Sequence, residues 1–477
     1  MRVLLVNPPR FQGIPVIREE RCEITERYSV LEPYSLLQIG ALLRQSGVEV
    51  RLADLNGFDQ DYGELRKVLA AFKPEAVIFR FTPTTFDHDM RTASMVKDIE
   101  RGIWTIGICW TLRTMPRSVL DQAPDLDFYV RQDYELVVPE LVQALIGRGD
   151  ASAVKGLAFR KGAEVVANDP PSEPADYDLL PMPAFDLLPS LDPYFITAPA
   201  GKPFSIIYTS KGCPFHCSFC TMAGTPWKPK SADKVVEELR YLKNHYRLRT
   251  ASFFDETFTL NRKRVESIAQ ALIDEDMEIH WYCNTRAHLV DEALLQRMHS
   301  AGCRGISYGI ESGSQAILDL AEKSLNVEQA RRSILWSKQA GIKVLCSFII
   351  GLPGENWKTV SETIAFVKET LPTSAQFNVA VPYPGTGLYR QIYGENGSEV
   401  DFRLLYQDKA VAGTTEMTPA ELNQARLLAY KALYLNPSWW LTNIMHVVKN
   451  PDDFELAFRY ALKVANNYFL RGMENAH

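Results

Sequence analysis

The sequence predicts an α/β protein in which a doubly wound parallel sheet precedes a partial (β/α) barrel and a small helical domain. Three observations support this prediction. Short apolar runs alternate with helical patterns up to about residue 150, a proline-rich stretch follows at 168–195, and strand–helix pairs recur between about 200 and 385. Strands that alternate with helices indicate a parallel sheet covered by helices.

The first predicted domain covers residues 1–150. Its expected strands are the apolar runs 2–7, 48–54, 76–81 and 104–109. Amphipathic patterns between these runs predict helices, the first of them over 34–47 with a glycine at its C-terminal end. Sheets of this kind bind ligands at the carboxyl ends of their strands. A binding edge is therefore expected where the expected strands end.

Residues 151–200 are predicted to be a linker, because 168–195 holds too many prolines for regular structure. The barrel is predicted over 201–390, with strands at 205–210, 250–254, 279–283, 305–310, 344–350 and 375–381. Eight strand–helix units would close a barrel, so the six units found here predict a partial barrel. Its active site is expected at the C-terminal ends of the strands. The helical domain is predicted over 391–477, with apolar faces in 421–435 and 454–470.

Composition limits the classes of function. The 52 basic and 58 acidic side chains leave a net charge of −6 without a basic stripe, so no nucleic-acid partner is expected. The first ten residues lack the long apolar run of a signal peptide. No stretch approaches the ~18 uncharged apolar residues of a membrane-spanning helix. A cytoplasmic protein with a small-molecule substrate or biosynthetic intermediate is expected.

The strongest signal for chemistry is KGCPFHCSFC at 211–220, which follows the strand expected at 205–210. Cys213, Cys217 and Cys220 place three thiols within eight positions. Thiolates are the ligands of iron–sulfur clusters, and three of them leave one iron open to chelate amino and carboxylate groups. His216 makes zinc an alternative, although structural zinc wants a fourth ligand and no Cys or His pair follows nearby. Inert thiols are the other alternative.

The spacing C-x-x-x-C-x-aromatic-C at the end of a first barrel strand resembles the signature of the radical S-adenosylmethionine (SAM) superfamily. The resemblance runs through the whole barrel and implies a [4Fe–4S] cluster on the three cysteines, SAM as cofactor, and an electron donor such as a flavodoxin or ferredoxin. It also implies SAM contacts at the ends of the later strands, where single motifs are weak but occur in the expected order. These are Asp255 and Glu256 for the amino group, Arg286 for the carboxylate, Glu311 and Ser312 for the ribose or methionine moiety, and Gly351 and Pro353 for the adenine.

The order of sheet, linker and barrel resembles the cobalamin-binding branch of that superfamily, also over 31–50 and 415–437. The resemblance implies a flavodoxin-like first domain that binds cobalamin. The candidate contacts at its binding edge are Arg80, Thr82, Thr84, Trp110 and Thr111.

The first domain departs from the known cobalamin motifs. Where cobalamin mutases carry Asp-x-His-x-x-Gly, with the cobalt-ligating His, this chain has Asn7-Pro8-Pro9-Arg10. Bound cobalamin should therefore have no His on its lower face, and His88 is interpreted as a helix-start or surface residue. The branch's usual Gly-Gly-x-His and Gly-Glu-Gly-Glu stretches are replaced at 107–110 and 131–135.

The resemblance implies a cobalamin-dependent methyltransferase that acts on an unactivated carbon. Three alternatives stay open. A radical SAM enzyme of the same branch performs a cyclisation or rearrangement without methylation. A methylthiotransferase needs a second cluster on N-terminal cysteines, where only Cys22 and Cys109 are present. A non-catalytic protein uses its cluster for structure or regulation.

Overall fold

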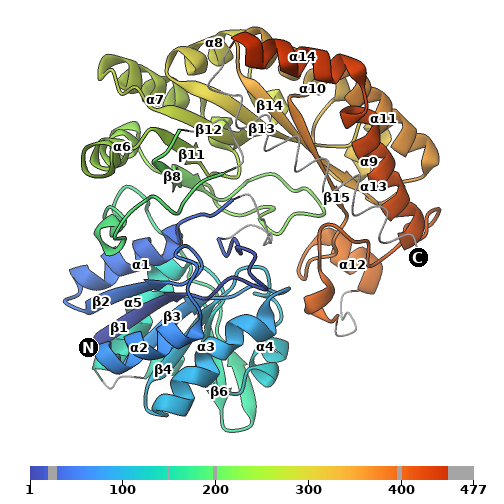
Figure 1. Cartoon of the computed structure of the whole chain (residues 1–477). Coiled ribbons are helices and arrows are strands. Elements are labelled where there is room, and N and C mark those ends of the chain that lie inside the picture. Colours follow the sequence, from blue (N-terminus) through green and yellow to red (C-terminus); the bar gives the residue numbers. More distant parts are fainter. Residues whose placement is uncertain (20–28, 148–149, 197–200, 395–399, 450–477) are drawn as a thin grey trace. The chain divides into compact units, whose positions relative to one another are not determined.

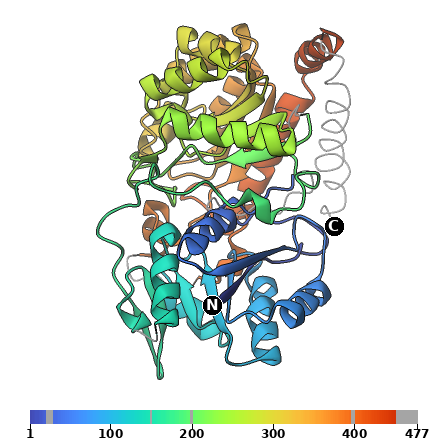
Figure 2. The same ribbon diagram turned by 90° about the vertical axis from the view of Figure 1, so that its left-hand side faces the viewer.

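The computed structural model describes residues 1–19, 29–147, 150–196, 201–394 and 400–449. The chain divides into two compact units, Met1–Ile196 with Tyr383–Leu405 and Thr197–Pro382 with Tyr406–His477 (Figures 1 and 2). The four-part division expected from the sequence stays a prediction. Cys22 and the apolar face expected over 454–470 lie outside the described residues.

The first unit is built on a seven-stranded sheet with the order β2-β1-β3-β4-β5-β6-β7. Its strands are β1 (Arg2–Asn7), β2 (Glu49–Asp54), β3 (Ala76–Arg80), β4 (Trp104–Ile108), β5 (Phe128–Val130), β6 (Leu157–Lys161) and β7 (Glu164–Ala167). Strands β1 to β5 are parallel, and β6 and β7 are antiparallel additions. The parallel order 2-1-3-4-5 is the flavodoxin-like doubly wound order, which confirms the predicted fold class.

Helices cover both faces of this sheet (Figure 1). They are α1 (Tyr34–Gln45), α2 (Tyr62–Phe72), α3 (Phe86–Ile99), α4 (Pro116–Gln122) and α5 (Tyr134–Ile146), with short 3₁₀ turns η1 (Ala151–Ala153) and η2 (Phe185–Leu187). Side chains of α1 and α5 pack in one core cluster with strand residues such as Val3, Leu5 and Ile78. The neighbouring strand residues Leu4 and Val77 are also fully buried. The side chains on both faces of these strands are therefore buried, which explains why the strands are near-continuous apolar runs.

The range expected to be a linker begins with part of the sheet. Strands β6 and β7 lie within 151–200 and extend the sheet beyond β5. The short strand β5 was not expected either. β5 could not be predicted because it has only three residues. β7 could not be predicted because its side chains are half-exposed or exposed along its length. Within 168–195 the structure has no regular element besides η2, in agreement with its prolines.

The second unit contains six parallel strands in the order β8-β11-β12-β13-β14-β15. They are β8 (Phe204–Ile207), β11 (Thr250–Phe253), β12 (His280–Thr285), β13 (Cys303–Glu311), β14 (Lys343–Ile350) and β15 (Ser374–Val379). The main helices between them are α6 (Ala232–Tyr246), α7 (Arg262–Asp274), α8 (Glu292–Ser300), α9 (Gln315–Leu320), α10 (Val327–Gln339) and α11 (Trp357–Thr370). Every strand lies next to its predecessor in this series, so the sheet is the predicted partial barrel.

Smaller elements complete the two units. The second unit also holds the strand pair β9 (Ser210–Lys211) and β10 (Lys228–Pro229) and the turns η3 (Phe258–Leu260) and η4 (Ala287–Leu289). After β15 the chain returns to the first unit with α12 (Gly387–Tyr393) and η5 (Phe402–Leu404). Helices α13 (Pro419–Tyr434) and α14 (Pro437–Lys449) belong to the same compact unit as the barrel.

Helix α13 covers the edge of the barrel sheet at β15. The Tyr434 hydroxyl accepts a hydrogen bond from Ala375 N (3.1 Å) and donates one to Ala375 O (3.0 Å). The Tyr430 hydroxyl pairs in the same way with the N and O of Phe377, at 3.0 and 3.3 Å. Two tyrosines thus satisfy backbone groups that an edge strand would otherwise expose. Within the described residues, none of the helices combines the length and hydropathy that crossing a lipid bilayer requires.

Candidate functional site

The predicted site residues of the second unit lie at the carboxyl ends of the barrel strands. The cysteine loop follows β8, Asp255 follows β11, Arg286 follows β12, Glu311 ends β13 and Gly351 follows β14. Because the strands are parallel and consecutive, their carboxyl ends share one edge of the sheet. The structure therefore brings the residues predicted for the cluster and for SAM to one edge.

The cysteine loop is held in place by its own backbone. Cys213 and Cys217 are buried and Cys220 is half-buried, and none of the three is in a disulfide. Gly212 has a φ of +92°, and a Cβ at this position would lie 2.0 Å from the carbonyl oxygen of Pro226. A side chain at Gly212 is thus excluded both by conformation and by space.

The loop suits a cluster with three thiolate ligands. The three thiols are free and share one short, fixed loop. Within the described part of the chain, no three His, Cys, Asp or Glu side chains are grouped as ligands of a single metal ion. A [4Fe–4S] cluster does not need its protein ligands grouped around one ion, because each thiolate binds a different iron atom.

Two carboxylates after β11 fix the segment that leads into this loop. Asp255 is fully buried, and it accepts hydrogen bonds from Thr209 N (2.8 Å), Thr209 Oγ1 (2.6 Å) and Ser210 Oγ (2.6 Å). Glu256 Oε2 accepts a hydrogen bond from Gly212 N at 3.0 Å. Both carboxylates therefore position the chain between β8 and Cys213. Their contact with the amino group of SAM stays a prediction.

Arg286 points at the cysteine loop. Its buried guanidinium donates from Nη1 to Cys217 Sγ at 3.2 Å, and its Cζ lies 3.9 Å from the centre of the Phe215 ring. The His288 ring meets the same Phe215 ring edge-on. Burial, and then the charges of Arg286 and Lys323, lower the pKa of His288 to about 4. His288 is therefore neutral near pH 7, and Arg286 carries the charge beside Cys217.

The end of β13 holds a buried ion pair. Glu311 has a φ of +71°, and Lys323 Nζ lies 2.6 Å from Glu311 Oε1. The next residue, Ser312, places its hydroxyl 3.1 Å from Thr363 Oγ1. Sequence reasoning missed Lys323, because it belongs to no motif and lies 12 residues after its partner.

The turn after β14 is organised by a buried carboxyl that the sequence analysis did not select. Gly351 has a φ of +94°, and its N donates to Glu355 Oε2 at 3.3 Å, so the turn closes around Pro353. Thr359 Oγ1 donates to Glu355 Oε1 at 2.6 Å. Burial raises the pKa of Glu355 to about 7, an effect that the two hydrogen bonds oppose and the nearby Glu362 charge reinforces.

Replacing Glu355 by glutamine is expected to remove a pH dependence of stability. A carboxyl whose pKa is higher in the folded state binds its proton more tightly there, so folding is favoured at low pH. Wild-type stability should fall as pH rises from about 4.5 to about 7 and level off above that. The loss amounts to about 3 kcal/mol, since one pKa unit corresponds to about 1.4 kcal/mol. Hydrogen exchange of the amides of β14 and α11 in wild type and Glu355→Gln, at pH 5 and pH 8 and corrected for the intrinsic exchange rates, measures this difference. A difference in stability between the two proteins that is the same at pH 5 and pH 8 would contradict the prediction.

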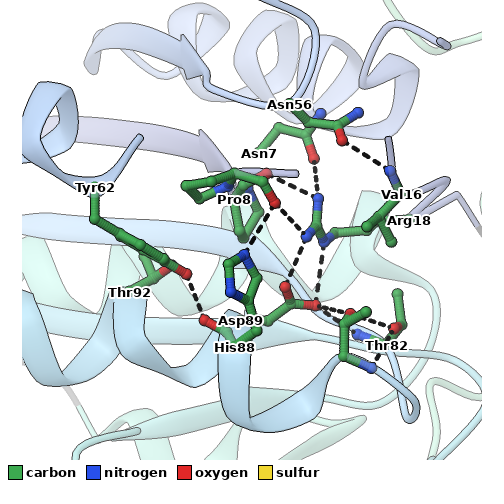
Figure 3. A network of polar contacts seen from close by, with 12 residues as sticks. Asn7, Pro8, Val16, Arg18, Asn56, Tyr62, Thr82, His88, Asp89 and Thr92 are labelled. Carbon is green, nitrogen blue, oxygen red and sulfur yellow. Dashed lines mark hydrogen bonds and ion pairs between the residues drawn. The ribbon is translucent and has the colours of Figure 1, made fainter. Parts of the chain in front are cut away.

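The carboxyl edge of the first sheet carries a buried polar network (Figure 3). Arg18 donates to both carboxylate oxygens of Asp89, at 3.1 and 2.7 Å, and to the carbonyl oxygens of Pro8 (2.8 Å) and Pro9 (2.9 Å). The side chains of Arg18 and Asp89 are 2% and 0% exposed. Asp89 also accepts from Thr82 N at 3.1 Å. The pair thus ties the ends of β1 and β3 together.

The residues predicted to contact cobalamin lie along this edge. Arg80 and Thr82 are buried at the end of β3, and Thr84 is half-buried. Trp110 is half-buried and Thr111 buried after β4, and the Arg113 guanidinium lies 4.4 Å from the Trp110 ring centre. A cavity of about 10 Å³, lined among others by Arg18 and Arg80, has room for about one water molecule. The contacts with cobalamin stay predictions.

His88 lies in the first turn of α3, and its Nε2 is 3.1 Å from Pro9 O. Its ring packs edge-on against Phe11 and Tyr62. Burial lowers the pKa of His88. These contacts give His88 a packing role within the first unit.

Three comparisons relate this chain to known proteins. Residues 207–367 match the Radical SAM superfamily. An uncharacterized methyltransferase of Pyrococcus horikoshii is 29% identical over 93% of this chain and 95% of its own length. The anaerobic magnesium-protoporphyrin IX monomethyl ester cyclase of Rubrivivax gelatinosus is 28% identical over 92% of this chain and 78% of its own length.

Among the similar solved structures is one that covers almost the whole chain. It is the cobalamin-dependent SAM radical enzyme OxsB with aqua-cobalamin and SAM bound. It superposes with a TM-score of 0.74 at 16% identity, covering 98% of this chain and 72% of that one. At this identity the similarity concerns the fold, which agrees with the architecture described above.

Proposed function

Because the chain is a radical SAM protein whose barrel follows an N-terminal α/β domain, we propose that it is a cobalamin-dependent methyltransferase acting on an unactivated carbon. The observation that carries the proposal is the loop of three free cysteines after β8, in a chain that also has a flavodoxin-like sheet. The methyltransferase relative of similar length and the cobalamin-binding structural neighbour support it.

The proposal gives each set of residues a task. Cys213, Cys217 and Cys220 hold the cluster, and Asp255 fixes the segment before them through Thr209 and Ser210. When bound, the cluster and SAM supply a 5′-deoxyadenosyl radical that abstracts hydrogen from carbon, and cobalamin supplies the methyl group. The chain binds and orients these groups and excludes water from them.

The remaining site residues bind and orient SAM in this proposal. Gly351 and Pro353 present backbone to the adenine, in a turn that Glu355 closes. Glu311 and Ser312 face the ribose or methionine moiety, with Lys323 holding Glu311 in place. In the first unit, Arg80, Thr82, Thr84, Trp110 and Thr111 form the cobalamin edge. The substrate is proposed to be a small molecule, and the electron donor a flavodoxin or ferredoxin.

Anaerobic reconstitution tests the cofactors first. The protein is incubated with iron, sulfide and hydroxocobalamin, passed over a gel-filtration column, and examined for metal content and absorption. About four iron atoms per chain together with stoichiometric cobalamin are expected. Iron without cobalamin would contradict the methyltransferase proposal and leave the radical SAM assignment intact.

Product analysis of the reconstituted protein tests the reaction. With reductant and SAM, the methyltransferase is expected to form both 5′-deoxyadenosine and S-adenosylhomocysteine. The second candidate is a cyclisation or rearrangement without methylation, which the similarity to the R. gelatinosus cyclase favours. It predicts 5′-deoxyadenosine without S-adenosylhomocysteine, so the ratio of the two products decides between the candidates.

A further inference from the structure

We infer that Arg286 is the counter-ion of the iron–sulfur cluster and raises its reduction potential through the hydrogen bond to Cys217. The inference rests on the proposed function, because it takes Cys213, Cys217 and Cys220 as the cluster's ligands. It gives Arg286 a task that is independent of SAM, in place of the predicted contact with the SAM carboxylate.

Two contacts of different kinds hold the Arg286 guanidinium against the cysteine loop. Nη1 donates to Cys217 Sγ at 3.2 Å, and the Phe215 ring centre lies 3.9 Å from Cζ. Phe215 belongs to the same loop and precedes Cys217 by two positions. The loop therefore supplies both the stacking platform and the hydrogen-bond acceptor, and together they fix the position of the guanidinium.

No carboxylate in the described part of the chain pairs with the charge of Arg286. Arg286 is 5% exposed, and its Nε and Nη2 have no hydrogen-bond partner among the described residues. No ion pair with a described carboxylate involves it. A guanidinium stays protonated even when buried, and burying an unpaired charge is costly. An anion is therefore expected beside it, and the sulfur 3.2 Å away is a thiolate when it binds iron.

The neighbouring cationic groups have other partners or carry no charge. Lys323 is engaged with Glu311 at 2.6 Å. His288 contacts Phe215 through its ring edge and is neutral near pH 7. Among the described side chains, Arg286 is the cation that donates a hydrogen bond to Cys217. Met222 N donates to Cys220 Sγ and the Thr257 hydroxyl lies 3.9 Å from Cys213 Sγ, but both groups are neutral. Removal of the Arg286 charge should therefore shift the cluster's potential measurably.

The direction of the effect follows from charge. Reduction adds one electron to the cluster, and a nearby cation with an N–H donor to the sulfur stabilises the more negative form. Arg286 therefore makes the cluster easier to reduce. Its loss should demand a stronger reductant than the wild type needs, even when SAM is absent.

The experiment is a redox titration of the reconstituted full-length protein without SAM, followed by electron paramagnetic resonance of the reduced cluster. Wild type is compared with Arg286→Met, which removes charge and donors, and with Arg286→Lys, which keeps the charge. Lys323→Met is the matched control, since it removes a buried cation of the same sheet edge that is bonded to Glu311. Iron and sulfide contents are measured for every protein.

Arg286→Met is expected to lower the ratio of reduced to oxidised cluster at a fixed potential by about tenfold or more. For a one-electron couple, tenfold corresponds to about 59 mV. Arg286→Lys should fall between this variant and wild type, and Lys323→Met should shift the ratio less than Arg286→Met. If Arg286→Met assembles no cluster, Arg286→Gln, which keeps an N–H donor but removes the charge, takes its place, and a loaded charge-removed variant with the wild-type potential overturns the inference.

The outcomes separate this inference from the proposed function. A wild-type protein that assembles no cluster contradicts the proposed function itself. A loaded Arg286→Met with the wild-type potential contradicts only the inference. If such a variant also binds SAM more weakly, Arg286 serves the SAM carboxylate alone.

Discussion

Replacing Cys217 by alanine is expected to lower the iron content from about four atoms per chain to less than about one and to abolish SAM cleavage. Two thiolates cannot hold a cluster that normally leaves only one iron without a protein ligand. Cobalamin binding should survive, because Cys217 lies in the second compact unit and the proposed cobalamin edge lies in the first. Iron and sulfide assays, cobalamin retention and 5′-deoxyadenosine formation measure the three effects.

The matched control is Cys346→Ala. Cys346 is fully buried in β14 and belongs to no cysteine-rich loop, so its replacement should leave the iron content unchanged. Zinc in place of iron in the purified wild type, lost in Cys217→Ala, would support the zinc alternative. Equal iron in Cys217→Ala and wild type would contradict the assignment of the cysteine loop.

The barrel could be predicted because its strands are apolar runs of four to nine residues that alternate with helical patterns. Strands β13 and β14 have nine and eight residues, and the chain revisits the sheet in sequence order, so local patterns suffice to define it. The cysteine spacing was equally local, with all three thiols inside 211–220. Strand β5 was missed because it has only three residues, and the hairpin β6–β7 because its apolar runs are short and partly exposed.

The site could be predicted only as a set of strand ends. Sequence order placed Asp255 and Arg286 at the correct edge but did not reveal what they contact. Asp255 accepts hydrogen bonds from Thr209 and Ser210, and Arg286 donates one to Cys217. These partners are separated by 45 to 69 positions in the sequence. Such contacts depend on how neighbouring strands align, which no local pattern encodes. The contact between Glu355 and Gly351 N spans only four positions, but Glu355 was missed as well, because a carboxylate after a turn is by itself no signal for a site.

The polar network of Arg18 and Asp89 at the first sheet shows most clearly that contacts between distant residues cannot be predicted from local patterns. Arg18 and Asp89 are 71 positions apart and belong to no motif. Arg18 also bonds to the carbonyls of Pro8 and Pro9, so the Asn-Pro-Pro sequence that replaces the known cobalt-ligand motif is anchored by a residue outside it. A buried ion pair at this position sets the conformation of the edge where cobalamin is proposed to bind.

Arg18→Met is therefore expected to destabilise the first unit strongly. It leaves Asp89 buried without its cation, and removal of one partner of a buried pair costs about 3–5 kcal/mol. The same change at Arg44, whose pair with Asp186 is 37% and 58% exposed, should cost less than about 1 kcal/mol. Because a protein with two compact units need not unfold in one step, the measurement is hydrogen exchange of the amides of β1 and β3.

The double variant Arg18→Met/Asp89→Leu tests the physical reason. It removes both charges, so it should cost less than the sum of the two single variants, with a coupling of about 1–3 kcal/mol. Some loss must remain, because the carbonyls of Pro8 and Pro9 and the N–H of Thr82 lose their partners. Additive losses would show that Arg18 and Asp89 stabilise the edge separately. Cobalamin retention should follow the same order as stability, since both depend on one connection between β1 and β3.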